Sequence, residues 1–128
     1  MAFAEVNYLN TGSSEPLFQT FTVSGANTVS TAVDTGLTSI KKLFIIWENE
    51  STSTYDALYG SMVYEVDLSS SKHSTGGASA STGQGYMTTV GDTTNNNYAA
   101  KIMSVSGGTF TVKNPAKGNV CTYYWYAE

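Results

Sequence analysis

The side chains suited to acid–base chemistry in this sequence are one histidine and two pairs of carboxylates at two-residue spacing. His73 lies in a stretch rich in serine and glycine, which is a poor place to hold catalytic geometry. Glu48 and Glu50 share one face of an extended chain, as do Glu65 and Asp67. Glycosidases use paired carboxylates, but solvated strand ends show the same spacing. We therefore expect no enzyme activity and no catalytic residue.

The sequence lacks the common motifs that carry a catalytic serine, a calcium ion or a phosphate group. It contains no Gly-x-Ser-x-Gly nucleophile turn, no Asp-x-Asx-x-Asx-Gly calcium loop and no glycine-rich loop followed by Lys-Ser/Thr. The single cysteine, Cys121, excludes an internal disulfide and a cysteine-based zinc site. Its place in an apolar strand pattern predicts a buried, unreactive thiol. We expect no cofactor and no metal.

Two polar segments hold the residue types that bind carbohydrate. Tyrosine rings can stack on sugar faces, and Asn and Asp side chains can bond to sugar hydroxyls. The candidate residues are Tyr55, Asp56, Asp92, Asn95, Asn96, Asn97 and Tyr98. Aromatic core positions and asparagine turns use the same residues, so glycan binding is an alternative hypothesis here.

The composition points away from several classes of partner. Charged residues make up 12% of the 128 residues, about half the usual share, and arginine is absent. A net charge of −4 without a basic patch disfavours nucleic-acid binding. No apolar run approaches the roughly 20 residues that span a bilayer, so we expect no membrane partner. An uncharged Ser/Thr/Asn surface is cheap to bury against a protein partner, although compositional drift explains it equally well.

The first residues, Met-Ala-Phe-Ala-Glu, lack the basic region and apolar core of a signal peptide. We therefore expect synthesis in a cytoplasm, with any export by another route such as lysis.

Period-2 alternation of apolar residues predicts an all-β domain, an antiparallel β-sandwich or jelly-roll-like barrel of about eight strands. Residues 1–16 are expected to form an N-terminal arm or lead-in, and residues 17–128 a single domain. The expected strands cover residues 17–23, 28–33, 40–47, 58–66, 85–90, 98–105, 109–113 and 120–127.

The pattern also predicts how some strands are connected and covered. The first two strands are expected to form a hairpin, and Ser106-Gly107-Gly108 a second, tighter one. The unbroken apolar run at residues 40–47 suits a central strand covered on both faces, at least at its middle. Residues 69–85, rich in Ser, Gly and Thr, are expected to form a long exposed loop.

The last strand carries aromatic residues on both faces. Cys121, Tyr123 and Trp125 lie on one face and are expected to enter the core. Tyr124 and Tyr126 lie on the other, where a neighbouring subunit is expected to cover them.

Three segments carry a resemblance to a known family: Asp34-Thr35-Gly36-Leu37 before an apolar strand, Gly107-Gly108 before Thr109–Val112, and the closing Tyr123–Glu128. In this order they resemble small β-domains of structural proteins from tailed bacteriophages and prophages. The resemblance runs from about residue 29 onwards. It implies a non-enzymatic virion protein, a head decoration or a tail or fibre component, made in the host bacterial cytoplasm.

The resemblance also implies a multi-copy protein that contacts other virion proteins, with a homotrimer favoured. Two further hypotheses stay open. The same domain would serve host recognition by binding a bacterial surface glycan, and a glycan-degrading enzyme is a third, less favoured reading.

Overall fold

The computed structural model describes residues 17–25, 30–51, 59–66, 72–78, 85–91, 93, 99–116 and 119–128. These residues form nine strands, and every pairing between strands is antiparallel. The strands are β1 (Gln19–Ser24), β2 (Ser30–Asp34), β3 (Lys42–Asn49), β4 (Tyr59–Glu65), β5 (Lys72–Ala78), β6 (Gly85–Thr89), β7 (Lys101–Ser106), β8 (Thr109–Lys113) and β9 (Val120–Ala127).

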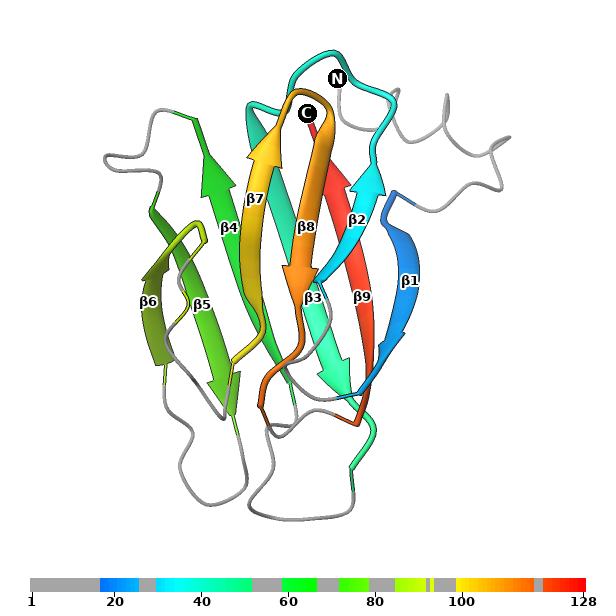
Figure 1. Ribbon diagram of the computed structural model, residues 1–128, viewed down its shortest axis with the longest axis vertical. Coiled ribbons are helices and arrows are strands. Elements are labelled where there is room, and N and C mark those ends of the chain that lie inside the picture. Colours follow the sequence, from blue (N-terminus) through cyan, green and yellow to red (C-terminus); the bar gives the residue numbers. More distant parts are fainter. Residues whose placement is uncertain are drawn as a thin grey trace, which may run out of the picture.

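Two sheets make up the fold. One has six strands in the order β1-β9-β3-β4-β5-β6, and the other has three in the order β2-β8-β7. Figure 1 shows the smaller sheet in front of the larger one, so the domain is a β-sandwich. The predicted fold class is confirmed. No helix in the described ranges is long and apolar enough to cross a bilayer.

The core lies between the two sheets and follows the predicted alternation. Leu43, Ile45 and Trp47 of β3 point inward from the larger sheet and are fully buried. Phe110 and Val112 of β8 meet them from the smaller sheet. Period-2 alternation therefore places one face of each of these strands in a shared apolar layer.

The expected hairpin of the first two strands is wrong. β1 pairs with β9 in the larger sheet, and β2 pairs with β8 in the smaller one. The connection between β1 and β2 therefore crosses from one sheet to the other. Alternation along a strand shows which residues face the core, but it does not specify the neighbouring strand. The second predicted hairpin is confirmed: β7 and β8 pair around Gly107 and Gly108.

The segment expected as a loop at residues 69–85 contains a strand instead. β5 pairs with β4 on one side and β6 on the other. His73 accordingly lies on a strand, opposite Tyr64 of β4. Main-chain hydrogen bonds build such a ladder without bulky side chains, so small residues gave no alternation to detect. The expected arm at residues 1–16 lies outside the described residues.

Asn114 joins the two sheets through a buried hydrogen-bond network. It follows β8 of the smaller sheet, and its Nδ2 donates to the carbonyls of Val23 (2.9 Å) and Gly25 (2.7 Å) beside β1. Its Oδ1 accepts a 2.6 Å hydrogen bond from the Tyr123 hydroxyl of β9. One side chain that follows the smaller sheet therefore bonds to three polar groups on the side of the larger sheet.

Burial of Cys121 is confirmed, and it has a consequence at high pH. Burial raises the pKa of the Cys121 thiol from 9.0 to about 12. Burial, followed by the charge of Cys121, raises the pKa of the Tyr123 phenol well above 10.0. Both groups hold their protons more tightly in the folded chain than in the unfolded chain. Their contribution to stability is therefore complete below pH 9 and is lost as pH rises towards 12.

We expect the melting temperature to fall steeply between pH 9 and pH 11. Thermal unfolding followed by circular dichroism at several pH values measures this. A Cys121→Ala variant should start from a lower stability, because it leaves a small cavity, but should lose less between pH 9 and pH 11. A melting temperature that stays constant from pH 8 to pH 11 would contradict the expectation.

Candidate functional site: the outer face of the six-stranded sheet

The outer face of the larger sheet, turned away from the core, carries apolar side chains at its centre. β3 alternates strictly, so its outward residues are Lys42, Phe44, Ile46 and Glu48. Phe44 is 40% exposed and Ile46 is 51% exposed. The expectation that both faces of this strand are covered is therefore wrong for the single chain: its outward face is open.

Strand register brings the predicted interface tyrosines beside these residues. Tyr126 of β9 lies opposite Phe44, and Tyr124 lies opposite Ile46. On the other side of β3, Val63 of β4 lies opposite Phe44. Tyr59, at the start of β4, is 60% exposed and lies opposite Glu48. The aromatic and aliphatic side chains thus form one continuous surface across three central strands, which we call the outer face.

The two tyrosine hydroxyls bond to carboxylates at opposite ends of the outer face. Tyr124 donates to Oε1 of Glu48 at 2.8 Å, and Tyr126 donates to Oε2 of Glu128 at 3.0 Å. The hydrogen bond from each phenol to its glutamate raises the pKa of both tyrosines, with smaller contributions from burial and from the carboxylate charge. The Tyr126 ring also contacts Phe18, with ring centroids 6.2 Å apart.

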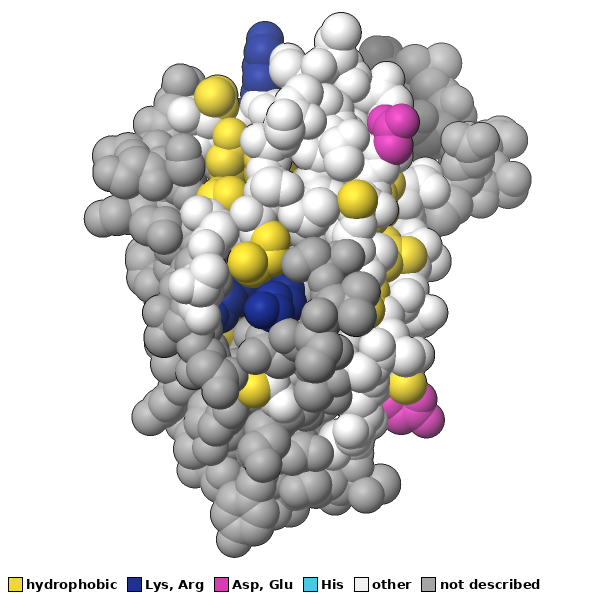
Figure 2. All heavy atoms as spheres, viewed as in Figure 1, with side chains coloured by type: hydrophobic (Ala, Val, Ile, Leu, Met, Phe, Trp, Pro, Cys, Tyr) yellow, Lys and Arg dark blue, Asp and Glu magenta, His cyan; other side chains and the backbone are white. Residues whose placement is uncertain are grey.

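The outer surface of the smaller sheet has a different character. Its outward residues include Ser104 of β7 and Thr111 of β8, whose hydroxyls lie 2.6 Å apart. Figure 2 shows this side. Its described residues are mostly white, the colour of the backbone and of side chains that are neither hydrophobic nor charged, and the hydrophobic groups form small separate patches. Among the described residues, the apolar side chains that adjoin one another across neighbouring strands thus lie on the outer side of the larger sheet.

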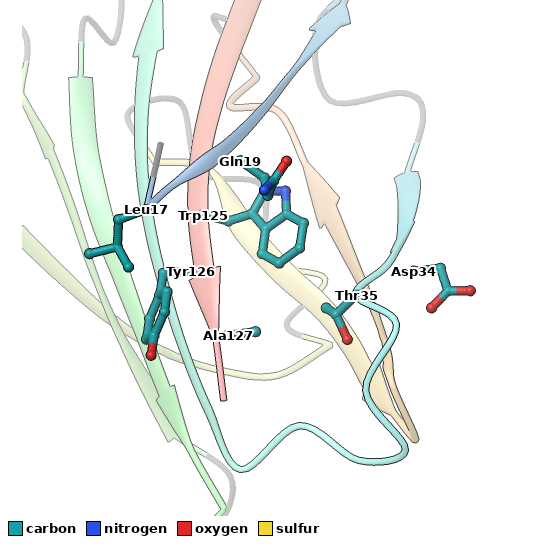
Figure 3. A pocket seen from close by; sticks show the side chains of 7 residues that line it. All are labelled: Leu17, Gln19, Asp34, Thr35, Trp125, Tyr126 and Ala127. Carbon is teal, nitrogen blue, oxygen red and sulfur yellow. The ribbon is translucent and has the colours of Figure 1, made fainter. Parts of the chain in front are cut away.

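A groove opens at the edge of the sandwich, where β1 and β9 face the end of β2. Its volume is about 370 Å³. The half-buried Trp125 indole stands in it with Gln19 alongside, and Asp34 and Thr35 line the opposite side (Figure 3). Phe110 packs edge-on against Trp125, with ring centroids 5.4 Å apart. The lining residues are Leu17, Gln19, Asp34, Thr35, Trp125, Tyr126 and Ala127.

Asp34 in this groove belongs to a tight turn. One carboxylate oxygen, Oδ1, accepts a 2.9 Å hydrogen bond from the Gly36 amide. The Thr35 hydroxyl donates to the Gly108 carbonyl at 2.7 Å. An aromatic surface beside a carboxylate and an amide resembles a carbohydrate subsite, and sequence reasoning missed it because its residues come from three separate strands.

The remaining candidates from the sequence are dispersed. Glu48 and Glu65 are outward-facing residues on β3 and β4, and they lie at opposite ends of the two strands, because Glu65 pairs with Lys42 and Glu48 pairs with Tyr59. Within the described ranges, no three His, Cys, Asp or Glu side chains gather closely enough to hold a metal ion. Asp67 and the loop candidates lie outside the described residues: Tyr55, Asp56, Asp92, Asn95, Asn96, Asn97 and Tyr98.

Comparison with known proteins adds no relative. No protein-family model matches the chain, and neither a curated protein nor a solved structure matches it significantly. The fold defines the protein as an antiparallel β-sandwich with an apolar outer face on its larger sheet.

Proposed function

We propose that this protein is a non-enzymatic structural subunit of a multi-copy assembly, which packs against a neighbouring protein through the outer face. The observation that carries the proposal is the pair Phe44 and Ile46, exposed at the middle of a six-stranded sheet. Single exposed apolar residues are common on proteins. A continuous apolar surface over several strands is less common on a monomer and typically marks an interaction site.

Burial of this surface would contribute useful binding energy. Covering the exposed half of Ile46 or Phe44 is worth roughly 1–2 kcal/mol per side chain. Tyr124 and Tyr126 add rigid aromatic area, and aromatic residues are enriched at the centres of protein interfaces. The threonines at the margin, Thr20 on β1 and Thr122 on β9, supply a polar rim.

The kind of assembly is proposed from the sequence resemblance. The order of the Asp34–Leu37 turn, the Gly107-Gly108 hairpin and the closing aromatic strand supports a virion subunit of a tailed bacteriophage or prophage. Head decoration and tail or fibre positions both suit a compact β-sandwich. Localisation to the virion and contacts with other virion proteins belong to the same proposal.

Replacing both central side chains by threonine tests the proposal. Phe44→Thr/Ile46→Thr keeps strand-compatible residues on β3 while removing apolar surface. We expect the wild-type protein to form a multimer by size-exclusion chromatography with light scattering, and the double variant to be monomeric. The thermal stability of the isolated fold should change little, because both side chains are half exposed in the single chain.

Ala32→Thr provides the matched control. Ala32 is an exposed residue of β2, on the outer surface of the smaller sheet. Its substitution should leave the multimer intact. The proposal fails if the wild-type protein stays monomeric at high concentration, or if Ala32→Thr disrupts assembly as strongly as the double variant does.

A second candidate function is glycan binding in the groove, as in a host-recognition domain. The half-buried Trp125 beside Gln19 and Asp34 supports it. Trp47 is fully buried, so a ligand in the groove should change the fluorescence of Trp125 alone. Titration with oligosaccharides from bacterial surfaces should then give a saturable change in the fluorescence of Trp125 that Gln19→Ala abolishes. No response from any such sugar would remove this candidate.

A further inference from the structure

The order of residues on the outward face of β3 indicates which kind of partner the outer face binds. Along the strand this order is Lys42, Phe44, Ile46 and Glu48, a cation and an anion enclosing two apolar side chains. When two copies of this strand lie face to face in opposite directions, each cation meets an anion and the apolar side chains meet each other. Resting on the proposed function, we infer that the partner is a second copy of this chain. The two copies are related by a two-fold axis that lies in the interface, perpendicular to β3, and passes between Phe44 and Ile46.

Rotation about this axis reverses the direction of the strand without moving it sideways. Lys42 of one copy then lies against Glu48 of the other, and Phe44 lies against Ile46. Successive outward residues are about 6.6 Å apart along a strand, so both charge pairs lie roughly 10 Å from the axis. An interface built on a two-fold axis must be self-complementary in this way, because each contact occurs twice.

The neighbouring strands are compatible with the same axis. Register with β3 places Tyr126 level with Phe44 and Tyr124 level with Ile46, so the axis sets Tyr126 of one copy against Tyr124 of the other. On β4, Val63 and Ser61 are exchanged by the same rotation, because they pair with Phe44 and Ile46. Every central position of the outer face therefore meets an apolar or small uncharged partner.

The charges around Lys42 show why the orientation matters. Its Nζ lies 3.8 Å from Oε1 of Glu128, and Glu65 lies opposite it on β4. Lys42 is thus flanked by two carboxylates of its own chain, and Glu48 of a second copy would be a third around the same ammonium group. The pairing of Lys42 with Glu48 therefore bears on the orientation of the two copies and adds little binding energy. In the opposite orientation, with the strands parallel, Lys42 would lie on Lys42 and Glu48 on Glu48. Like charges placed together in this way disfavour the parallel arrangement.

The outer face alone gives a modest interface. Its three strands, about 4.8 Å apart and rising about 3.3 Å per residue, have a projected area of roughly 350 Å². Side-chain relief raises the accessible area above this value. A standard protein interface covers about 800 Å² on each partner, so we expect a weak dimer that forms at high protein concentration.

Charge exchange between residues 42 and 48 tests the inference. We expect Lys42→Glu to weaken dimerisation at least about tenfold, because it sets three carboxylates against Glu48 of the second copy twice per dimer. Glu48→Lys alone should have a smaller effect, because Glu65 and Glu128 still face the new cation. The double variant Lys42→Glu/Glu48→Lys should recover dimerisation, and a mixture of the two single variants should form heterodimers. Sedimentation equilibrium measures all four.

Tyr124→Phe is the matched control, because Glu48→Lys also removes the Tyr124–Glu48 hydrogen bond. It should leave the dimer intact. If the wild-type protein assembles through the outer face but the double variant shows no recovery, the two-fold arrangement is overturned and the proposed function stands. A trimer in solution overturns it as well. A wild-type protein that is monomeric at every concentration removes both the arrangement and the proposed function.

Discussion

Gly108→Ala should lower the free energy of unfolding by about 3 kcal/mol or more, one of the largest losses for a single substitution in this chain. Gly108 lies in the turn between β7 and β8, where a Cβ atom would collide with the main-chain carbonyl of Leu37. The Gly108 carbonyl accepts hydrogen bonds from the Thr35 amide at 2.9 Å and from its hydroxyl at 2.7 Å. The neighbouring Gly107 carbonyl accepts one from the Ile40 amide at 2.9 Å.

The added Cβ is fixed by the main chain of residue 108 and the atoms that it meets are main-chain atoms of Leu37, so no side-chain rotation relieves the collision. The segment around Leu37 must move away from the turn, and its hydrogen bonds to the turn would be lost. Gly36→Ala is the matched control: its φ is +82°, but nothing lies within 4 Å of the added Cβ. It should cost only the backbone strain, about 1–2 kcal/mol. Equal losses for the two variants in urea unfolding would show that the contact at Gly108 is not tight.

Asn114→Leu should cost about 3 kcal/mol of unfolding free energy, because it removes three hydrogen bonds, two of them buried. The Tyr123 hydroxyl loses its acceptor, and the Val23 and Gly25 carbonyls lose a donor. For a domain of this size the melting temperature should fall by roughly 10 °C. Differential scanning calorimetry on the wild-type protein and the variant measures it.

Tyr123→Phe separates the hydroxyl from the rest of the network. Alone it should cost less than Asn114→Leu, because the ring stays stacked on Phe21 with centroids 5.0 Å apart. The double variant should lose less unfolding free energy than the sum of the two single losses, since both substitutions remove the same hydrogen bond. Additive losses, or a loss below about 1 kcal/mol for Asn114→Leu, would contradict the role of Asn114 in joining the sheets.

The sequence predicts the sandwich because alternation along each strand is a local property. Cys121 and Tyr123 are buried as the pattern of the last strand requires, and the Gly107-Gly108 turn joins the strands on either side of it. Strand pairing is not local. Alternation could not reveal that β1 lies beside β9, because the two strands are separated by most of the chain.

The same distinction between local pattern and strand pairing applies to the candidate site. Tyr124 and Tyr126 could be assigned to an outward face from alternation alone, and they lie there. Asn114 reads in the sequence as part of a turn before Pro115, and nothing in its neighbours reveals that its amide holds both sheets. The groove escaped prediction for the same reason, since Gln19, Asp34 and Trp125 meet only in the folded chain.

Hydroxyl-radical footprinting at low and high protein concentration tests most directly whether the outer face is covered in the assembled protein. Labelling of Phe44, Ile46 and Tyr59 should fall sharply as the protein assembles. Labelling of Leu37, an exposed residue between β2 and β3 and away from the outer face, should stay constant. Unchanged labelling of Phe44, Ile46 and Tyr59 in the assembled protein, or protection of Leu37 in their place, would contradict assembly through this face.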